Sequence, residues 1–265
     1  MQTKNIVILN YHKISERMDI GLTARHPDDF ERDLRLFHEQ GFKSVTFLDL
    51  IKAPEKLPPR ALIITFDDGY RSVIEHAYPL MEQFGFKGVV YIPTDYIGKS
   101  NDWDVQFGGK KYVHLNAQEL KFLADSGFEI GSHGASHRSF KAMPLRQCED
   151  ELKRSKIILE QIAQKPVVSI SYPFGQFNRQ ILALSRNAGY RFGVGSIFYR
   201  SLASLDGLSV MALRRFNIYR SDSMRTVRKK LTANFNSIYA YRDWLIQQGS
   251  MATVLWQKVF KTKDV

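Results

Sequence analysis

The sequence predicts an α/β fold in which a largely parallel sheet curls into a barrel. Segments that read as strands alternate along the chain with segments of helical period, an order typical of parallel β-α-β units. Six or more such pairs follow one another within 265 residues, without an internal repeat or a low-complexity linker. Because α/β barrels of roughly 200–250 residues fold as one unit, we expect a single domain over residues 1–265.

The predicted strands are short apolar runs that end at turn residues or at polar residues. They cover 5–11, 42–47, 61–66, 88–93, 128–132, 166–173, 190–196 and 211–219. The run "ALIITF" at 61–66 is apolar almost throughout, as expected of a strand that is buried on both faces. Strands of this kind in one uninterrupted chain favour a barrel or barrel-like sheet over two domains.

The predicted helices lie between these strands and carry start and stop signals. They cover 27–41, 72–84, 115–127, 145–164, 178–189 and 223–231. In the first, Phe30, Leu34 and Phe37 recur at helical spacing, acidic residues occupy the first turn, and Gly41 ends the helix. Asn116 is the expected N-cap of the third helix.

The composition is that of a globular protein whose carboxyl-terminal half is basic. Residues 141–265 hold 21 of the 38 Lys and Arg but 8 of the 27 Asp and Glu, and 222–265 are expected to form a basic helical segment. This basic half can bind an anionic membrane surface or an anionic glycan. Alternatively, it is a basic face in contact with solvent. No nucleic acid is expected as a partner, because helix-turn-helix, zinc-finger and aromatic RNA-binding signatures are absent from the sequence.

The amino terminus bears on the cellular location of the protein, and the cysteine count bears on the ligands that a metal could use. "MQTKNIVILNYHKIS" has a shorter apolar run than the roughly 7–15 residues of a secretory signal, and no stretch approaches the roughly 20 apolar residues of a membrane span. We therefore expect a cytoplasmic protein, with peripheral attachment to the inner membrane as an extension. Cys148 is the single cysteine, so a metal would have to bind His, Asp or Glu.

Residues with catalytic potential follow four of the predicted strands. The strand ends read "LNYHK", "TFDDGY", "EIGSHGASH" and "SYPFG". In α/β barrels the reactive groups gather at the carboxyl ends of the strands, so these four segments are expected to meet.

Two histidines and two aspartates in these segments fit a catalytic metal site. His133 and His137 are four residues apart, although Gly134 replaces the Glu of an HExxH metalloprotease. Taken alone, the two histidines can be ordinary surface residues. Taken alone, "TFDDGY" can be a strand followed by an Asp-Gly turn. Together, two histidines and one carboxylate form the ligand set of a catalytic zinc. Since adjacent strand residues point to opposite sides, Asp68 can bind the ion while Asp67 takes a proton from water.

These segments resemble the motifs of the polysaccharide deacetylases of the NodB-homology type, carbohydrate esterase family 4. "TFDDGY" resembles the first motif, "SHGASH" the H-S/T-x-x-x-H metal motif with a small residue in place of the usual hydroxyl, and "SYPFG" the third motif. The similarity extends from "ILNYHKIS" to "LRRFNI" and is greatest to the branch of biofilm poly-N-acetylglucosamine deacetylases. It implies a distorted (β/α)7 barrel of the NodB-homology type.

The resemblance implies a metal-dependent hydrolase that removes acetyl groups from N-acetylglucosamine-type units of a polysaccharide or of its biosynthetic intermediate. Asp68, His133 and His137 are then expected to bind a divalent metal, Zn²⁺ foremost, with Co²⁺, Ni²⁺ and Fe²⁺ as alternatives. Asp67 becomes the general base. A glycan-binding protein with a decayed deacetylase site, and an O-acetyl esterase that acts on a glycan, remain alternatives.

The resemblance also assigns residues around this centre. The Phe174 backbone N–H is expected to stabilise the oxyanion, and Tyr70 and Tyr172 to contact the acetylated glycan. Many family members carry a late histidine as general acid, but all seven histidines of this chain lie at or before residue 137. In the biofilm branch an amino-terminal Tyr-His supplies that group, so His12 in "NYHK" is the expected acid, or else a strand-end histidine bonded to a neighbour.

The arginine that pairs with the general base in many family members is not at its usual position in this sequence. Many members have an arginine before the Pro of the third motif, where this chain has Ser171 and Tyr172. Arg215 in "LRRFNI" is the expected partner of Asp67, with Arg214 as the alternative, because strand alternation sends the two to opposite faces. Either arginine can also be a plain surface charge.

Overall fold

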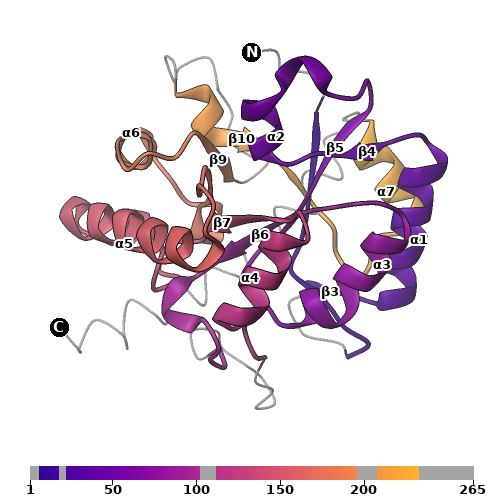
Figure 1. The fold of residues 1–265 in the computed structure, drawn as a ribbon, viewed down its shortest axis with the longest axis horizontal. Coiled ribbons are helices and arrows are strands. Elements are labelled where there is room, and N and C mark those ends of the chain that lie inside the picture. Colours follow the sequence, from indigo (N-terminus) through magenta and orange to yellow (C-terminus); the bar gives the residue numbers. More distant parts are fainter. Residues whose placement is uncertain (1–5, 18–21, 102–111, 196–207, 233–265) are drawn as a thin grey trace.

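A computed structural model describes residues 6–17, 22–101, 112–195 and 208–232 of the chain (Figure 1). Its main sheet has nine strands, every pair of them parallel, in the order β10-β9-β8-β7-β6-β5-β1-β11, with β4 paired to β5. The strands are β1 Val7–Tyr11, β4 Lys43–Ser44, β5 Ala61–Phe66, β6 Val89–Ile92, β7 Glu129–Ser132, β8 Ser169–Ser171, β9 Phe192–Gly195, β10 Leu213–Arg214 and β11 Phe216–Asn217. A further small sheet pairs β2 Lys13–Ile14 with β3 Ala24–Arg25.

One short segment closes the main sheet into a ring. On one side β10 pairs with β9 through Leu213 and Val194, and on the other β11 pairs with β1 through Phe216 and Leu9. Only Arg215 separates β10 from β11, so residues 213–217 act as one strand between the two edges of the sheet. The ring therefore has seven strand positions within the described residues, and the expected distorted (β/α)7 barrel is confirmed.

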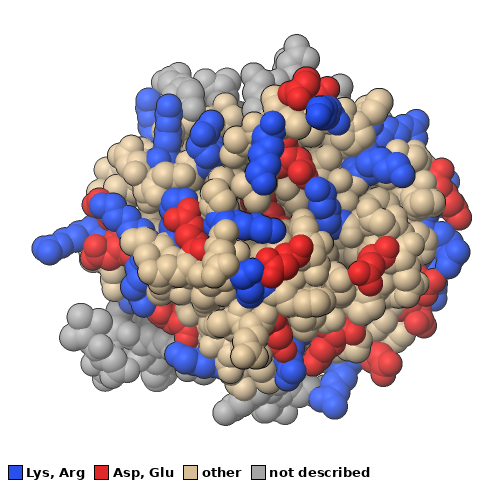
Figure 2. Space-filling view, in the orientation of Figure 1, with Lys and Arg blue, Asp and Glu red and all other residues tan. Residues whose placement is uncertain are grey.

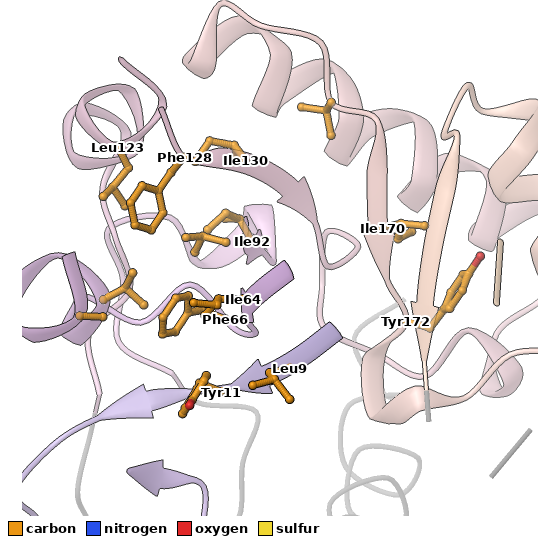
Figure 3. Close-up of a cluster of buried hydrophobic side chains, with 14 of the residues drawn as sticks. Leu9, Tyr11, Ile64, Phe66, Ile92, Leu123, Phe128, Ile130, Ile170 and Tyr172 are labelled. Carbon is orange, nitrogen blue, oxygen red and sulfur yellow. The ribbon is translucent and has the colours of Figure 1, made fainter. Parts of the chain in front are cut away.

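Helices surround this ring of strands (Figure 1). They are α1 Pro27–Glu39, α2 Phe47–Lys52, α3 Tyr78–Gln83, α4 Ala117–Asp125, α5 Leu145–Ala163, α6 Arg179–Asn187 and α7 Met224–Leu231. Apolar side chains from alternate strand positions fill the space between strands and helices; Figure 3 shows Leu9, Ile64 and Ile130 among them. The intervening positions of the strands point into the barrel.

Two predicted elements differ from those observed. The predicted strand at 42–47 is reduced to β4, because Thr46 and Asp49 form a capping box that starts α2 at Phe47. The predicted helix at 72–84 divides into a wide π-helical turn, Val73–Ala77, followed by α3. Pro79 explains the division, because it has no N–H to donate and its ring clashes with the carbonyl of a regular preceding turn.

The charged surface and the carboxyl-terminal segment bear on the expected membrane contact. Lys and Arg are interspersed with Asp and Glu over much of the face in Figure 2, so this face gives no support for such a contact. The predicted basic segment at 222–265 begins with α7, whose N-cap is Ser223, and from residue 233 onward it lies outside the described residues. Among the described helices, none combines the length and apolar character that crossing a bilayer requires.

A buried ion pair joins α1 to the chain that follows the closing strand. Arg25 and Asp33 are at most 1% exposed, and the guanidinium binds the carboxylate through Nη2–Oδ1 at 2.8 Å and Nε–Oδ2 at 3.0 Å. Arg25 Nη1 also donates to the carbonyls of Tyr219 at 3.1 Å and Asp222 at 2.8 Å. Burial raises the pKa of Asp33 to about 6 in spite of Arg25, so the pair is charged at pH 8.

Replacing Asp33 with Asn is expected to lower the free energy of unfolding at pH 8 by about 3–5 kcal/mol, because it leaves the buried Arg25 charge without a counterion. Urea unfolding followed by circular dichroism measures the change. Asp29→Asn is the control on the same helix, since Asp29 pairs with Arg32 on the surface, where an ion pair contributes at most about 1 kcal/mol. Equal losses in the two variants would contradict this role of the buried pair.

Candidate active site

The chemistry-bearing residues meet at the carboxyl ends of the barrel strands. Asp67 and Asp68 directly follow β5, His133 follows β7, and His12 follows β1. The loop after β7 also carries His137. The meeting of these strand ends agrees with the sequence expectation, because parallel strands present their carboxyl ends at one rim of a barrel.

Three side chains at this rim form a donor set for a metal ion. The ligand atoms of Asp68, His133 and His137 all lie within 4.8 Å of one another. Asp68 Oδ1 is 3.4 Å from His133 Nε2 and 3.1 Å from His137 Nε2. Tetrahedral zinc with ligands at about 2.0–2.1 Å would separate neighbouring ligand atoms by about 3.3 Å. The spacing of these residues therefore fits a zinc-sized ion.

The hydrogen bonds of His133 support this fit. Its Nδ1 lies 2.6 Å from the Ser171 carbonyl, which can only accept, so Nδ1 carries a proton. Nε2 is then the nitrogen that faces Asp68: it donates to the carboxylate while the ring is protonated and offers a lone pair to a metal once that proton is lost. Burial raises the pKa of Asp68, but the hydrogen bonds from His133 and His137 outweigh burial and hold that pKa well below 3.8. An ionised carboxylate and a correctly oriented imidazole are the forms that bind a divalent metal.

The backbone at the site is strained. Five described residues other than glycine have a positive φ, and three of them are Asp68 at 67°, His137 at 53° and Phe174 at 59°. Each such conformation costs about 1–3 kcal/mol unless its surroundings enforce it, and strain of this kind clusters at functional sites. Gly69 continues the turn at φ 60°, where an added Cβ would lie 2.5 Å from Ile92 Cδ1. The turn after β5 thus requires a glycine.

Asp67 is held inside the barrel mouth by an arginine. Arg215 Nη1 donates to Asp67 Oδ1 at 2.7 Å, and Arg215 Nη2 donates to Asp67 Oδ2. Ser171 Oγ accepts from the same guanidinium at 2.9 Å. Burial raises the pKa of Asp67, but Arg215 and His133 outweigh burial and bring it below 3.8. Asp67 is therefore ionised at neutral pH, as a proton acceptor must be.

The structure distinguishes the two arginines that the sequence left open. Arg215 is 6% exposed and faces Asp67, whereas Arg214 lies at the surface with its guanidinium 4.8 Å from the ring of Phe216. Residues 213–217 act as one extended strand, so the adjacent side chains of Arg214 and Arg215 point to opposite faces.

His12 lies partly exposed at the same rim. Its pKa falls below 6.5 because burial outweighs the attraction of the Asp68 and Asp67 carboxylates. His12 follows Tyr11, which pairs with Phe66 just before Asp67, so the imidazole and the two aspartates follow neighbouring strands.

Phe174 brings a backbone donor to the site. It occupies the turn Pro173–Gly175, and its ring packs edge-on against His137 with 5.0 Å between ring centroids. Among the described residues, no backbone carbonyl accepts a hydrogen bond from the Phe174 N–H.

The two tyrosines predicted to contact substrate are both buried. Tyr172 is fully buried in the apolar core, where its ring packs against Phe177 at a centroid distance of 4.9 Å (Figure 3). Tyr70 is 2% exposed and stacks on His114 beneath the turn that carries Asp68. Both rings are enclosed by protein in this structure, so their contact with a glycan stays a prediction.

Sequence reasoning missed two residues that support the site. Asn10 Oδ1 accepts from Arg215 at 3.0 Å, and Asn10 Nδ2 lies 3.4 Å from Asp67 Oδ2. His114 Nδ1 donates to the Asp68 carbonyl at 2.7 Å, and burial lowers its pKa to about 4, so the ring is neutral. A polar Asn in the apolar run "IVILNY" was a usable signal for the first, whereas His114 stands in a segment without a motif.

Comparison with known proteins relates the chain to one family. Residues 55–193 match the family model described as polysaccharide deacetylase. "Putative polysaccharide deacetylase YxkH" of Bacillus subtilis (strain 168) is 31% identical over 71% of this chain, which spans 63% of that relative's length. The "Poly-beta-1,6-N-acetyl-D-glucosamine N-deacetylase" of Staphylococcus aureus (strain MSSA476) is 24% identical over 70% of each chain.

Solved structures share the fold at low sequence identity. BC0361, a polysaccharide deacetylase from Bacillus cereus, superposes with a TM-score of 0.70 at 22% identity, over 85% of this chain and 68% of its own. IcaB from Ammonifex degensii superposes with a TM-score of 0.67 at 18% identity, over 89% of this chain and 97% of its own. At these identities the likeness is one of barrel architecture.

Proposed function

Because this chain belongs to the polysaccharide deacetylase family, we propose that it removes acetyl groups from N-acetylglucosamine-type units of a glycan or of its biosynthetic intermediate, with the help of a divalent metal. One observation carries the proposal. An ionised Asp67, clamped by Arg215, stands directly beside the convergent donors of Asp68, His133 and His137. A base and a metal-sized donor set side by side are the requirements of metal-assisted amide hydrolysis.

The donor set determines which residues hold the metal and what the metal supplies. Asp68, His133 and His137 would hold it, with Zn²⁺ as the first choice for two imidazoles and one carboxylate. A bound divalent ion supplies Lewis acidity toward a carbonyl oxygen and lowers the pKa of water. Co²⁺, Ni²⁺ and Fe²⁺ suit the same nitrogen-rich set.

The remaining residues divide the proton and charge handling between them. Asp67 accepts a proton from the water that attacks the acetamide carbon, and Arg215 keeps its carboxylate ionised and oriented. The Phe174 N–H donates to the carbonyl oxygen as negative charge develops there. His12, at the end of the neighbouring strand β1, delivers a proton from its protonated form to the departing sugar amine.

The substrate part of the proposal draws on the relatives. The name of the staphylococcal relative specifies a β-1,6-linked N-acetylglucosamine polymer, and we extend that class of acetylated glycan to this chain. A glycan-binding protein with a decayed site is less consistent with the structure, because the base, its arginine and all three donors are present together.

Acetate release from a β-1,6-linked N-acetylglucosamine oligomer tests the proposal. We expect the Zn²⁺-loaded protein to release acetate and an equal amount of free sugar amine, and to lose this activity on treatment with a chelator. An O-acetylated xylo-oligosaccharide is the comparison substrate. If the protein released acetate from this substrate and not from the N-acetylated oligomer, it would be an O-acetyl esterase and not an amide hydrolase. No acetate from any acetylated sugar would rule out the enzyme and leave the glycan-binding alternative.

A further inference from the structure

The loop that joins the two metal-donor histidines is anchored to α5 through all of its intervening amides. The Gly134 N–H donates to Ser132 Oγ at 3.1 Å, and Ser132 Oγ in turn lies 2.9 Å from Ser155 Oγ on α5. The next two amides, of Ala135 and Ser136, both donate to Glu151 Oε2, at 2.8 Å and 2.9 Å. Three consecutive amides therefore depend on one face of α5.

Glu151 and Ser155 are four residues apart, so their side chains lie on one face of α5. Glu151 is 6% exposed, and its carboxylate is aimed inward at the histidine loop rather than at solvent. A buried carboxylate is costly unless hydrogen bonds compensate it, and here two backbone donors do so. Nothing in the reaction proposed above uses this carboxylate.

A second set of contacts holds Glu151 and the other edge of the loop. Arg154 lies with its Nη2 3.6 Å from Glu151 Oε1 and binds Asp95 through both nitrogens, at 2.6 Å and 3.0 Å. The Asp95 N–H donates to the Ala135 carbonyl at 3.0 Å. Glu151, Arg154, Asp95 and Ala135 thus form a closed ring of contacts around the loop.

Two residues of the loop have left-handed backbone conformations that the surrounding residues must stabilise. Gly134 has a φ of 74°, and an added Cβ there would lie 3.1 Å from Phe140 Cζ and 3.5 Å from Glu151 Oε2. His137 is in the left-handed region at φ 53° without the freedom of a glycine. The surroundings must therefore impose the loop conformation that aims both imidazoles at Asp68.

We propose that Glu151 is a positioning residue for the metal centre, which sets the separation of the His133 and His137 donor atoms by fixing the two amides between them. This inference rests on the proposed function, because it assumes that these histidines bind a metal. Glu151 itself does not coordinate the ion. Side chains that hydrogen-bond a metal ligand typically contribute about 10–100-fold to metal affinity, and Glu151 acts on the backbone between two such ligands.

Zinc affinity of the full chain tests the inference, measured by competition with a chromophoric chelator. Glu151→Met removes the acceptor at similar size and is expected to weaken Zn²⁺ binding by about 10–100-fold. Glu151→Gln keeps an oxygen acceptor, and both amides donate to a single oxygen, so its affinity is expected to stay closer to that of the wild type. Glu149→Met is the matched control, because Glu149 forms an exposed ion pair with Lys153 on the same helix.

Two further readouts separate positioning from a plain effect on folding. The visible spectrum of the Co²⁺-loaded protein is expected to change in Glu151→Met and not in Glu149→Met, because it reports ligand geometry. The melting temperature of the metal-free proteins measures the folding contribution alone. A Glu151→Met protein that melts lower but keeps wild-type zinc affinity and Co²⁺ spectrum would overturn the inference.

Failure of the inference is distinguishable from failure of the proposed function. A wild-type protein that binds no Zn²⁺ or Co²⁺ would overturn both the metal site and the role of Glu151. Tight wild-type binding together with unchanged Glu151→Met binding would overturn the role of Glu151 alone. Equally weak binding by Glu151→Gln and Glu151→Met would assign the effect to charge and so also contradict positioning through hydrogen bonds.

Discussion

Replacing Asp67 with Asn is expected to reduce kcat for acetate release by about 10²–10⁴-fold, the usual contribution of a general base. The amide keeps the shape of the side chain and can still contact Arg215, but it cannot take a proton from water. The metal donors Asp68, His133 and His137 are unchanged, so the variant is expected to bind one equivalent of Zn²⁺ and remain inactive. Steady-state kinetics on the Zn²⁺-loaded variant measure the effect.

The control for this substitution is Asp125→Asn, because Asp125 makes an exposed ion pair with Lys121 at 2.6 Å on α4, away from the rim. It is expected to keep wild-type kinetics. If Asp67→Asn retained activity within tenfold of the wild type while fully loaded with zinc, another group would have to be the base.

Replacing Arg215 with Met is expected to have the second largest effect, on both activity and stability. The substitution leaves the buried Asp67 carboxylate without its counterion, and loss of one partner of a buried pair costs about 3–5 kcal/mol. It also releases the orientation of the base, so kcat is expected to fall together with the free energy of unfolding. Urea unfolding and acetate release on the same preparation measure the two effects.

Two variants make this prediction specific. Arg214→Met is the matched control one residue away, and it is expected to leave both quantities near wild type because Arg214 points outward. Arg215→Lys keeps the charge but not the two-nitrogen contact, so it is expected to fall between the wild type and Arg215→Met. Equal losses in the Arg214 and Arg215 variants would show that Arg215 has no special relation to Asp67.

Local sequence patterns were sufficient to predict the fold and the meeting of Asp68, His133 and His137. Strand and helix signals alternate clearly enough to predict a parallel barrel, and the barrel rule then brings four strand ends to one rim. Alternation also separates Arg215 from Arg214 correctly, since the closing strand continues through both. The same rule explains the burial of Tyr172, because Ser171 points into the barrel toward Arg215 and its neighbour therefore points to the helices.

Contacts between distant segments were not predictable in the same way. Glu151 lies 14 positions after His137 in an ordinary amphipathic helix, and nothing in its neighbourhood marks it as the acceptor for the histidine loop. His114 reaches the Asp68 carbonyl only because a later segment runs back beneath the turn after β5. The predicted strand at 42–47 is mostly absent because the cap formed by Thr46 and Asp49 starts a helix there. Predicting this would have required more weight for the cap than for the β-prone residues.

Activity as a function of added zinc tests the central claim most directly. The metal-free full chain is titrated with Zn²⁺ while acetate release from the N-acetylglucosamine oligomer is followed. Activity is expected to rise from near zero and to saturate at one equivalent of Zn²⁺, and His133→Ala is expected to prevent this rise. Activity that is already full in the metal-free protein, or that is unaffected by loss of His133, would contradict this claim.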